Sequence, residues 1–352
     1  MKLSFRWYGE TDPVQLCQIR QIPGMKGIVT ALYDVPVGEV WPLDAIRALQ
    51  KPIEEAGLTI SVIESVPVHE DIKMGLPSRD RYIENYQQTL RNLAAANVPV
   101  VCYNFMPLFD WVRTTLSYEL PDGSNTLAYD DAEIAQLDLL SGEGKLPAWN
   151  VSYTKDELHR LYKIFRDMSE ETLWENLTYF LQAIMPVADE VGIKMAIHPD
   201  DPPWSVLQLP RIVTNRANLD RLLAIHDSPN HGLCLCTGSL GCNPANDIVE
   251  MARHFAAQGR VNFVHMRNVK VVGERSFYES GHLSETGSVD MYQVMQALRQ
   301  SGFDGPFRPD HGRMIWEETG NPGYGLYDRA LGAAYLNGLL EAVDKQGGKA
   351  GV

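Results

Sequence analysis

The residues Ile193-Lys-Met-Ala-Ile-His198 form a short apolar run that ends in a histidine and is followed by Pro199. A run of this length and composition is typical of a buried β-strand. Three later strand-like runs also end in a side chain that can bind a metal ion, namely Cys236, His265 and Asp310. Each step between these residues is about as long as one strand plus one return helix. The spacing therefore predicts a site assembled at one rim of a (β/α)₈ barrel, where successive strand ends meet.

Strand-like runs and helical patterns alternate along almost the whole chain. The predicted strands cover residues 3–8, 27–32, 59–65, 98–105, 193–198, 232–236, 261–267 and 303–310. The predicted helices cover residues 12–22, 42–57, 79–97, 172–191, 217–227, 246–258, 288–301 and 327–345. Strands that alternate with helices imply a parallel sheet, and eight of them imply closure into a single α/β TIM barrel over residues 1–352.

One interval breaks this alternation. Residues 106–171, after the fourth predicted strand, combine Asp, Gly, Ser and Pro with aromatic side chains such as Phe109, Trp111 and Tyr118. Because this insertion follows the C-terminal end of a strand, we expect it to lie over the rim that carries the metal-binding candidates. Its aromatic content favours an ordered lid or an oligomer contact over a disordered excursion.

Composition limits the possible functions. The chain has 352 residues, of which 45% are hydrophobic, and a net charge of −14. A large core is therefore possible, while binding to nucleic acid or to an acidic membrane surface is disfavoured. A small-molecule substrate is the better expectation. The first residues do not resemble a signal peptide and no apolar run approaches a membrane span, so we expect a cytoplasmic protein. Five cysteines in so long a chain suggest reduced thiols.

The metal-binding candidates also have a structural interpretation. A single strand-end histidine usually serves as a hydrogen-bonded structural residue, and a buried cysteine behaves as a small hydrophobic side chain. His198 and His265 with a cysteine on the intervening strand nevertheless favour a metal site. Alternation puts Cys234 and Cys236 on one face, and Cys236, nearer the strand end, is the better candidate ligand. A separate zinc cluster that adds Cys242 would lack the paired short spacing of such sites.

Five segments, spread over most of the chain, carry a more specific signal. They are Ile197-His-Pro-Asp-Asp-Pro-Pro203, Leu235-Cys-Thr-Gly-Ser239, His265-Met-Arg-Asn-Val-Lys270, Arg308-Pro-Asp-His-Gly-Arg313 and Asn321-Pro-Gly-Tyr324. Together they resemble the mannonate dehydratase family of hexuronate catabolism, whose xylose-isomerase-like TIM barrel holds a divalent metal ion. The resemblance implies four metal ligands: His198, Cys236, His265 and Asp310. It also implies His311 and Tyr324 as the acid and base, with Tyr327 as a rival for the role of Tyr324.

The reaction implied by this resemblance is the dehydration of D-mannonate to 2-keto-3-deoxy-D-gluconate. A metal ion would stabilise the charge that forms as a proton leaves the carbon beside the carboxylate. A general base removes that proton and a general acid protonates the departing hydroxyl group. The imidazole of His311 is the more natural base and the phenol of Tyr324 the more natural acid. A nearby metal ion could invert this assignment, so the two residues are taken as a pair.

An anionic substrate also needs positive groups and hydrogen-bonding side chains near the metal. The candidate substrate contacts are Arg267, Arg308, Arg313, Asn104, Trp7 and Tyr8. By strand alternation, Arg308 shares a face with Asp310, and Arg267 shares a face with His265. His311 would point away from Asp310 on a regular strand, but a bend at the following glycine could bring both into one cavity. Alternatively, the arginines only form internal ion pairs.

The metal and the reaction both have alternatives. Thiolate and imidazole ligands favour zinc, but four protein ligands in a tetrahedron would make a closed structural site. Catalysis needs open positions, so Mn²⁺ or Fe²⁺ is expected, in agreement with the family resemblance. A sugar isomerase or epimerase on the same barrel and a non-catalytic sugar-acid or metal-binding protein are the competing functions. We also expect a homo-oligomer.

Overall fold

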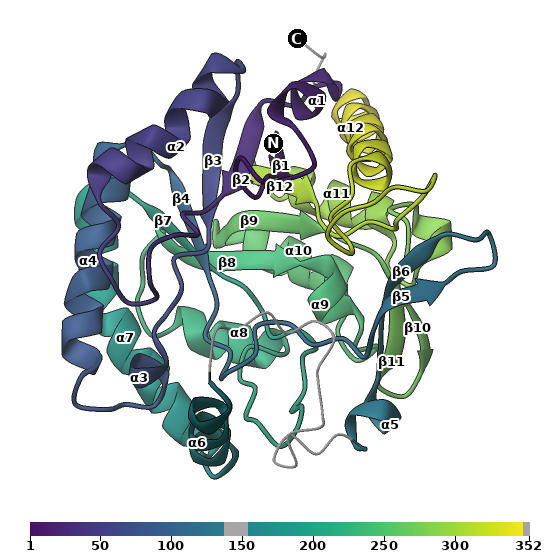
Figure 1. Cartoon of the computed structure of the whole chain (residues 1–352). Helices are drawn as coiled ribbons and strands as arrows, with labels where there is room; N and C mark the ends of the chain where they lie inside the picture. The colour runs from purple at the N-terminus through teal and green to yellow at the C-terminus, as the bar shows by residue number, and fades with distance from the viewer. Residues whose placement is uncertain (137–153, 348–352) are drawn as a thin grey trace.

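The computed structural model describes residues 1–136 and 154–347, so residues 137–153 of the predicted insertion lie outside the described part. Eight parallel strands form a closed barrel, in the spatial order β1-β12-β9-β8-β7-β4-β3-β2 (Figure 1). Their bounds are β1 Lys2–Arg6, β2 Gly27–Thr30, β3 Thr59–Glu64, β4 Val100–Tyr103, β7 Lys194–Ile197, β8 His231–Cys236, β9 Val261–Met266 and β12 Pro306–Pro309. The predicted (β/α)₈ barrel is therefore confirmed.

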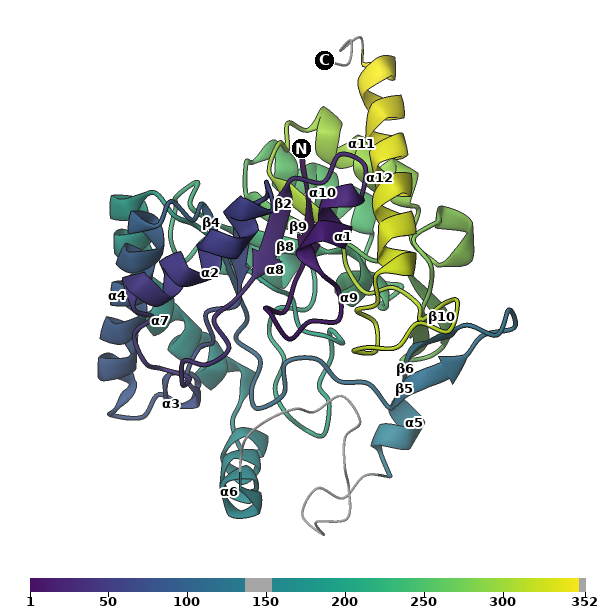
Figure 2. The ribbon, with the colours of Figure 1, turned by 45° about the horizontal axis from the view of Figure 1, so that its top comes forward.

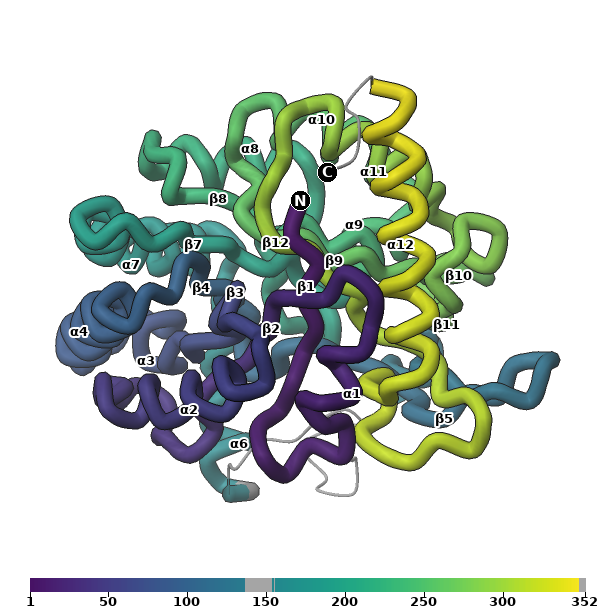
Figure 3. Tube along the Cα trace, turned by 90° about the horizontal axis from the view of Figure 1, so that it is seen from above, coloured from purple at the N-terminus to yellow at the C-terminus, as the bar shows by residue number. Residues whose placement is uncertain are grey.

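Helices connect the strands and surround the barrel (Figure 3). The main ones are α1 Leu16–Gln21, α2 Leu43–Glu55, α4 Arg79–Ala95, α7 Glu170–Val191, α8 Arg216–Leu223, α10 Ile248–Ala257, α11 Met291–Gln300 and α12 Tyr327–Gln346. Local sequence signals set several of their ends. The Ser169 side chain accepts a hydrogen bond from the backbone of Thr172 at the start of α7, and Gly192 ends that helix in the left-handed conformation at φ 73°.

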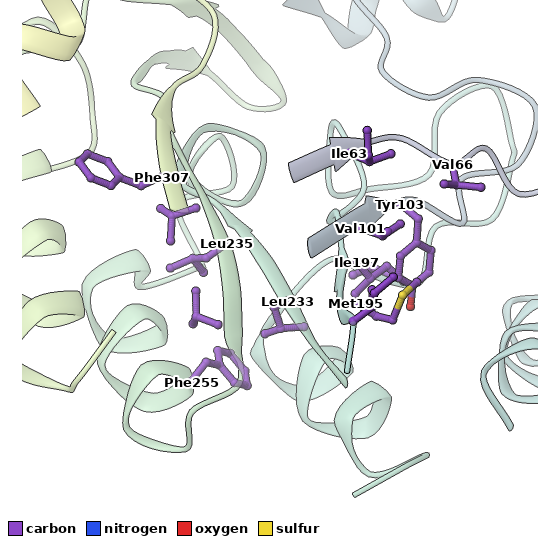
Figure 4. Close-up of a cluster of buried hydrophobic side chains, with 14 of the residues drawn as sticks. Ile63, Val66, Val101, Tyr103, Met195, Ile197, Leu233, Leu235, Phe255 and Phe307 are labelled. Atoms are coloured by element: carbon purple, nitrogen blue, oxygen red, sulfur yellow. The ribbon is translucent and has the colours of Figure 1, made fainter. Parts of the chain in front are cut away.

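The alternation of side chains along the strands decides what faces the barrel interior. Val62, Val100, Cys102, Ala196 and related residues form a compact apolar cluster inside the barrel. The intervening residues belong to the larger apolar core between strands and helices, part of which Figure 4 shows. These include Ile63, Val101, Ile197 and Leu235. Side chains two positions apart on a strand point to the same side. A residue two positions after an inward-facing residue, at the C-terminal end of the strand, therefore also faces the barrel interior.

A second, antiparallel sheet in the order β10-β11-β6-β5 lies beside the barrel. The insertion supplies β5 (Thr115–Glu119) and β6 (Asn125–Asp130), and the connection after β9 supplies β10 (Val269–Gly273) and β11 (Ser276–Glu279). With α5 (Asp131–Ile134) and α6 (Lys155–Arg166), these strands gather at the end of the barrel opposite the N-terminus (Figure 2). Because β1 starts at the N-terminus and the strands are parallel, this is the end at which the strands finish.

Among residues 1–136 and 154–347, no helix is both long and apolar enough to cross a bilayer.

Candidate metal centre and active site

A cavity of about 460 Å³ opens at the C-terminal ends of the barrel strands. Its polar lining comes from nearly all of the strand ends and the loops that follow them. The polar and aromatic residues that line it include Arg6, Tyr8, Glu64, Asn104, Trp111, His198, Asp201, His265, Arg267, Arg308, Asp310, His311 and Tyr324. This convergence is the arrangement by which a barrel collects functional groups from distant parts of a chain.

Four side chains meet on the barrel side of this cavity. The ligand atoms of His198, Cys236 and His265 all lie within 4.8 Å of one another. The Nε2 atom of His198 is 3.2 Å from Nδ1 of His265. Asp310 adds a carboxylate, whose Oδ2 lies 3.5 Å from His265 Nδ1 and 3.9 Å from the Cys236 sulfur. The backbone carbonyl of Pro199 lies 2.7 Å from His198 Nδ1, so that nitrogen can donate to it and leave Nε2 free to bind a metal.

The electrostatics of this group favour a cation. Burial alone would raise the pKa of the Cys236 thiol, but the Arg267 guanidinium and hydrogen bonds from the two histidines hold it well below its ordinary value. Burial likewise opposes ionisation of Asp310, but Arg308 and His265 hold the pKa of its carboxyl well below the usual range. Burial and Arg308 oppose a charge on His265, but Glu64 and Asp310 raise the pKa of its imidazole well above the ordinary value. A thiolate and a carboxylate thus lie beside two histidines, and a bound metal ion would take the place of the proton that His265 holds. Their chemistry fits a divalent transition metal.

Local structure fixes the position of the thiol. Cys236 ends β8 and caps the short helix α9 (Thr237–Gly241), whose Ser239 backbone amide and hydroxyl group lie 3.4 Å and 3.0 Å from the sulfur. Gly238 allows Arg267 to lie across this helix, because a Cβ atom at position 238 would be only 2.1 Å from Arg267 Nε. The Cys-Thr-Gly-Ser segment thus combines a candidate ligand, its hydrogen-bond donor and the space for a neighbouring guanidinium.

The other cysteines occupy different surroundings. Cys234 lies one inward position below Cys236, and its sulfur forms a second close group with Cys102 and His265 in the barrel interior. The Cys242 thiol donates to the backbone carbonyl of Ser239 at 3.1 Å. Within the described residues, no potential metal-binding group joins all three of Cys234, Cys236 and Cys242.

His311 and Tyr324 form a contact pair beside the four candidate metal ligands. The Nε2 atom of His311 is 2.7 Å from the Tyr324 hydroxyl and 4.0 Å from Asp310 Oδ1. Because β12 ends at Pro309, the strict alternation of side chains stops there and His311 can turn into the same cavity as Asp310. Burial, followed by the nearby Asp310 charge, raises the pKa of Tyr324. The phenol therefore retains its proton at neutral pH.

Comparison with known proteins decides which family this site represents. The family model for D-mannonate dehydratase matches residues 1–349. The chain belongs to the mannonate dehydratase family. It is 63% identical over 343 residues to mannonate dehydratase 2 of Halalkalibacterium halodurans, covering 97% of this chain and 99% of the relative. It is 57% identical over 345 residues to the mannonate dehydratase of Streptococcus uberis, covering 98% and 99% of the two chains.

Solved structures agree with this membership. The mannonate dehydratase of Streptococcus suis serotype 2 superposes with a TM-score of 0.94 at 51% identity, covering 100% of this chain and 97% of that one. An L-ribulose 3-epimerase shares the fold at a TM-score of 0.57 and 15% identity, covering 99% of this chain and 97% of the epimerase. The second likeness concerns the architecture alone, so the mannonate dehydratase relatives carry the functional comparison.

Four of the six predicted substrate contacts line the cavity of this mannonate dehydratase family member: Tyr8, Asn104, Arg267 and Arg308. The structure does not place the other two there. Trp7 and Tyr8 follow the end of β1 at Arg6, where the chain is still extended, so their side chains face opposite sides and Trp7 packs into the core. Arg313 lies beyond the strand end and pairs with Asp328 and Asp122.

Tyr327 and His282 both lie outside the cavity lining. Tyr327, the rival of Tyr324, begins α12, is 42% exposed and packs against Trp316. It is not among the residues that line the cavity. His282, in the connection after β11, is buried against Gly332 and likewise does not line the cavity.

The arginines of the cavity both line it and form internal ion pairs. Arg308 Nη2 lies 2.7 Å from Asp310 Oδ1 and 3.1 Å from Glu64 Oε2. Arg6 reaches the same Glu64 oxygen at 3.0 Å. Arg308 Nε and Nη1 have no hydrogen-bond partner among the described residues. Glu64 and Arg6 were missed by the sequence analysis, although alternation from the inward-facing Val62 and Ser4 could have found them.

A second set of missed residues lies behind His311. Glu279 at the end of β11 contacts His311 Nδ1, and Arg113 from the insertion contacts Glu279. Asp201, which follows β7, pairs with both Arg113 and Arg267. No local motif marks Glu279 or Arg113. The second sheet carries Glu279, begins just after Arg113 and brings together segments about 150 residues apart.

Proposed function

We propose that this chain catalyses the dehydration of D-mannonate, with His311 and Tyr324 as the proton-transfer pair. The full-length similarity to mannonate dehydratases supports the reaction and makes the chain a hydro-lyase. The observation that carries the residue roles is the 2.7 Å contact between His311 and Tyr324 at the rim where two histidines, a cysteine and an aspartate converge.

The same proposal assigns the metal ligands. His198, Cys236, His265 and Asp310 would hold one divalent cation. When bound, this cation would supply Lewis-acid chemistry toward the charge that develops next to the substrate carboxylate. A closed tetrahedral site would leave no position for substrate, so we propose Mn²⁺ or Fe²⁺, which accept five or six ligands, in preference to Zn²⁺.

The residues of the chain would handle two protons. His311 Nε2 accepts the proton from C2 of D-mannonate, and the resulting electron pair forms the C2–C3 double bond as the C3 hydroxyl leaves. The Tyr324 phenol donates its proton to that hydroxyl, which departs as water, and the enol rearranges to 2-keto-3-deoxy-D-gluconate. The raised pKa of Tyr324 keeps the phenol protonated until the transfer, as a general acid requires, and argues against its acting as the base. Each of these transfers contributes about 10²- to 10⁴-fold in rate.

The cationic side chains would bind and orient the acid. Arg308 offers Nε and Nη1 without other partners among the described residues, and both Arg267 and Arg308 line the cavity with Asn104 and Tyr8. Planar guanidinium groups recognise carboxylates through paired hydrogen bonds. A sugar isomerase or epimerase would need the same barrel but would release no water, so the product separates the two functions.

The test uses metal-stripped protein. It is incubated with D-mannonate or D-gluconate, Mn²⁺, Fe²⁺ or Zn²⁺ is added in turn, and the 2-keto-3-deoxy acid is measured. We expect product from D-mannonate with Mn²⁺ or Fe²⁺. Absence of product under all conditions would remove the dehydratase proposal, and a product of unchanged elemental composition would indicate an isomerase or epimerase.

A further inference from the structure

We propose that Glu279 and Arg113 are positioning residues for the pair His311 and Tyr324. Glu279 ends β11 of the second sheet, and Arg113 lies in the segment that leads into β5, so neither comes from a barrel strand. This inference rests on the proposed function, because it assumes that His311 moves a proton. Neither residue is among those that line the cavity. Both would act through the imidazole.

The geometry at Glu279 fixes which nitrogen of His311 carries hydrogen. Both carboxylate oxygens of Glu279 lie 2.8 Å from His311 Nδ1, and the side chain has no exposure. Burial opposes its ionisation, but His311, Arg113 and Arg267 together lower the pKa of Glu279. An ionised carboxylate only accepts hydrogen bonds, so Nδ1 must donate. In the neutral form of the His311 imidazole, the lone pair is then on Nε2, which faces Tyr324.

A competing contact does not reverse this assignment. Arg267 Nη1 is 3.3 Å from His311 Nδ1, and a guanidinium can only donate. The two Glu279 contacts are shorter by 0.5 Å and join the nitrogen to a charged acceptor. Nδ1 therefore donates to Glu279, and the guanidinium of Arg267 is directed instead to Asp201, whose Oδ2 is 2.6 Å from its Nη2.

Arg113 holds the carboxylate of Glu279 in place. Its Nε and Nη2 lie 3.0 Å and 2.5 Å from Glu279 Oε1, and its Nη1 lies 2.8 Å from Asp201 Oδ1. The Arg113 side chain is fully buried. The planar guanidinium thus bridges two carboxylates, one at the end of β11 and the other in the segment after β7. Because Arg113 and Arg267 balance the charges of Asp201 and Glu279, the four groups can be buried together without an uncompensated charge.

The same hydrogen-bond network reaches the metal ligands. Ser239 contacts both Asp201 Oδ2 and the Cys236 sulfur, each at 3.0 Å. A continuous set of contacts therefore runs from the thiol ligand through Asp201 and Arg113 to Glu279 and His311. The insertion and the connection after β9 serve, on this view, to place an acceptor behind the catalytic imidazole.

The backbone around Glu279 offers a matched control. Thr126 on β6 donates its hydroxyl hydrogen to the backbone carbonyl of Glu279 at 2.8 Å and is buried. Thr126→Val would loosen the attachment of β11 to β6 while leaving the Glu279 carboxylate in place. A purely structural role of this strand predicts that the Thr126 and Glu279 variants behave alike.

The test compares Glu279→Gln, Glu279→Asp and Thr126→Val in the full-length, manganese-loaded protein. We expect kcat for D-mannonate to fall about 10- to 100-fold in both Glu279 variants, the range typical of a partner that orients an active histidine. KM and the metal content should stay near those of the wild type, and the isotope effect of deuterium at C2 should increase. Glu279→Asp keeps the charge that Arg113 needs, so it covers the case in which Glu279→Gln does not fold. Thr126→Val should keep the wild-type kcat.

A second readout does not depend on turnover. Nitrogen NMR of ¹⁵N-histidine-labelled protein, with the His311 signals identified by their loss in His311→Gln, should show hydrogen on Nδ1 in the wild type and a changed state in Glu279→Gln. Wild-type kcat in both Glu279 variants, equal losses in Thr126→Val, or hydrogen on Nε2 in the wild type would each overturn the inference. Hydrogen on Nδ1 in a wild type that does not dehydrate D-mannonate would overturn the proposed function and leave the positioning geometry intact.

Discussion

Tyr324→Phe removes a single hydroxyl group from the proposed acid and leaves the ring. The ring packs edge-on against Tyr8, with centroids 4.9 Å apart at 86°, and this packing needs no hydroxyl. The lost group contacts His311 Nε2 at 2.7 Å, so the cost to stability should be about 1 kcal/mol, the usual net value of one hydrogen bond. The fold and the metal ligands should therefore survive the substitution.

The effect on catalysis should be much larger. Loss of a general acid lowers kcat by about 10²- to 10⁴-fold, which raises the barrier by about 2.7 to 5.4 kcal/mol at 1.36 kcal/mol per tenfold change. The assay is the initial rate of 2-keto-3-deoxy-D-gluconate formation from saturating D-mannonate, with the manganese content measured on the same sample. A Tyr324→Phe protein with normal metal content and wild-type kcat would refute the assignment. Loss of metal instead would make Tyr324 a structural residue.

Tyr327→Phe is the matched control for this experiment. The two tyrosines are three residues apart, but Tyr327 is 42% exposed and lies outside the cavity lining. We expect its kcat to equal that of the wild type. An equal loss of kcat in Tyr327→Phe would show that the loop, rather than the Tyr324 hydroxyl, determines the rate.

Three further predictions follow from the buried charges and the tight packing around the cavity. Arg113→Met leaves two buried carboxylates short of a cation, so the free energy of unfolding measured with denaturant should fall by about 3 to 5 kcal/mol, and an unchanged value would contradict the buried network. Burial opposes ionisation of Asp201, but Arg113 and Arg267 hold the pKa of its carboxyl well below the usual value. The ionised carboxylate therefore stabilises the fold above pH about 3.9, and this stabilisation is lost as the pH falls through the lower pKa of the folded state. The difference in unfolding free energy between wild type and Asp201→Asn should narrow in acid, and a constant difference would be evidence against this ion pair. Gly238→Ala places a Cβ atom 2.1 Å from Arg267 Nε and should lower the free energy of unfolding by about 1 to 3 kcal/mol. Gly338→Ala on α12, with no atom within 4 Å of its Cβ, should be neutral or stabilising. Equal effects of the two substitutions would show that Arg267 moves aside freely.

The barrel and the convergence of the four proposed metal ligands were predictable because both depend on local patterns. Strand-length apolar runs, alternating with helices, identified all eight barrel strands, and the side chain at the end of a run indicated what reaches the rim. Strict use of the same alternation would have replaced Trp7 with Arg6 as the inward neighbour of Tyr8. It would also have found Glu64, two residues beyond the inward-facing Val62.

The second sheet was not predictable in the same way. The hairpin of β10 and β11 turns at Glu274-Arg275, which lacks the Asn-Gly or Asp-Gly pair that marks a two-residue turn. Its pairing with β6 joins residues such as Phe277 and Tyr129, far apart in the chain. Glu279 contacts His311, and Arg113 contacts Glu279, through segments that only this long-range pairing brings together, so no local motif could have indicated them.

Anomalous diffraction from crystals of the manganese-loaded protein tests the central claim most directly. The account predicts one manganese peak within coordinating distance of the side chains of His198, Cys236, His265 and Asp310, with at least one position left open toward His311 and Tyr324. A peak elsewhere, or one that excludes Cys236 or Asp310 from coordination, would contradict it.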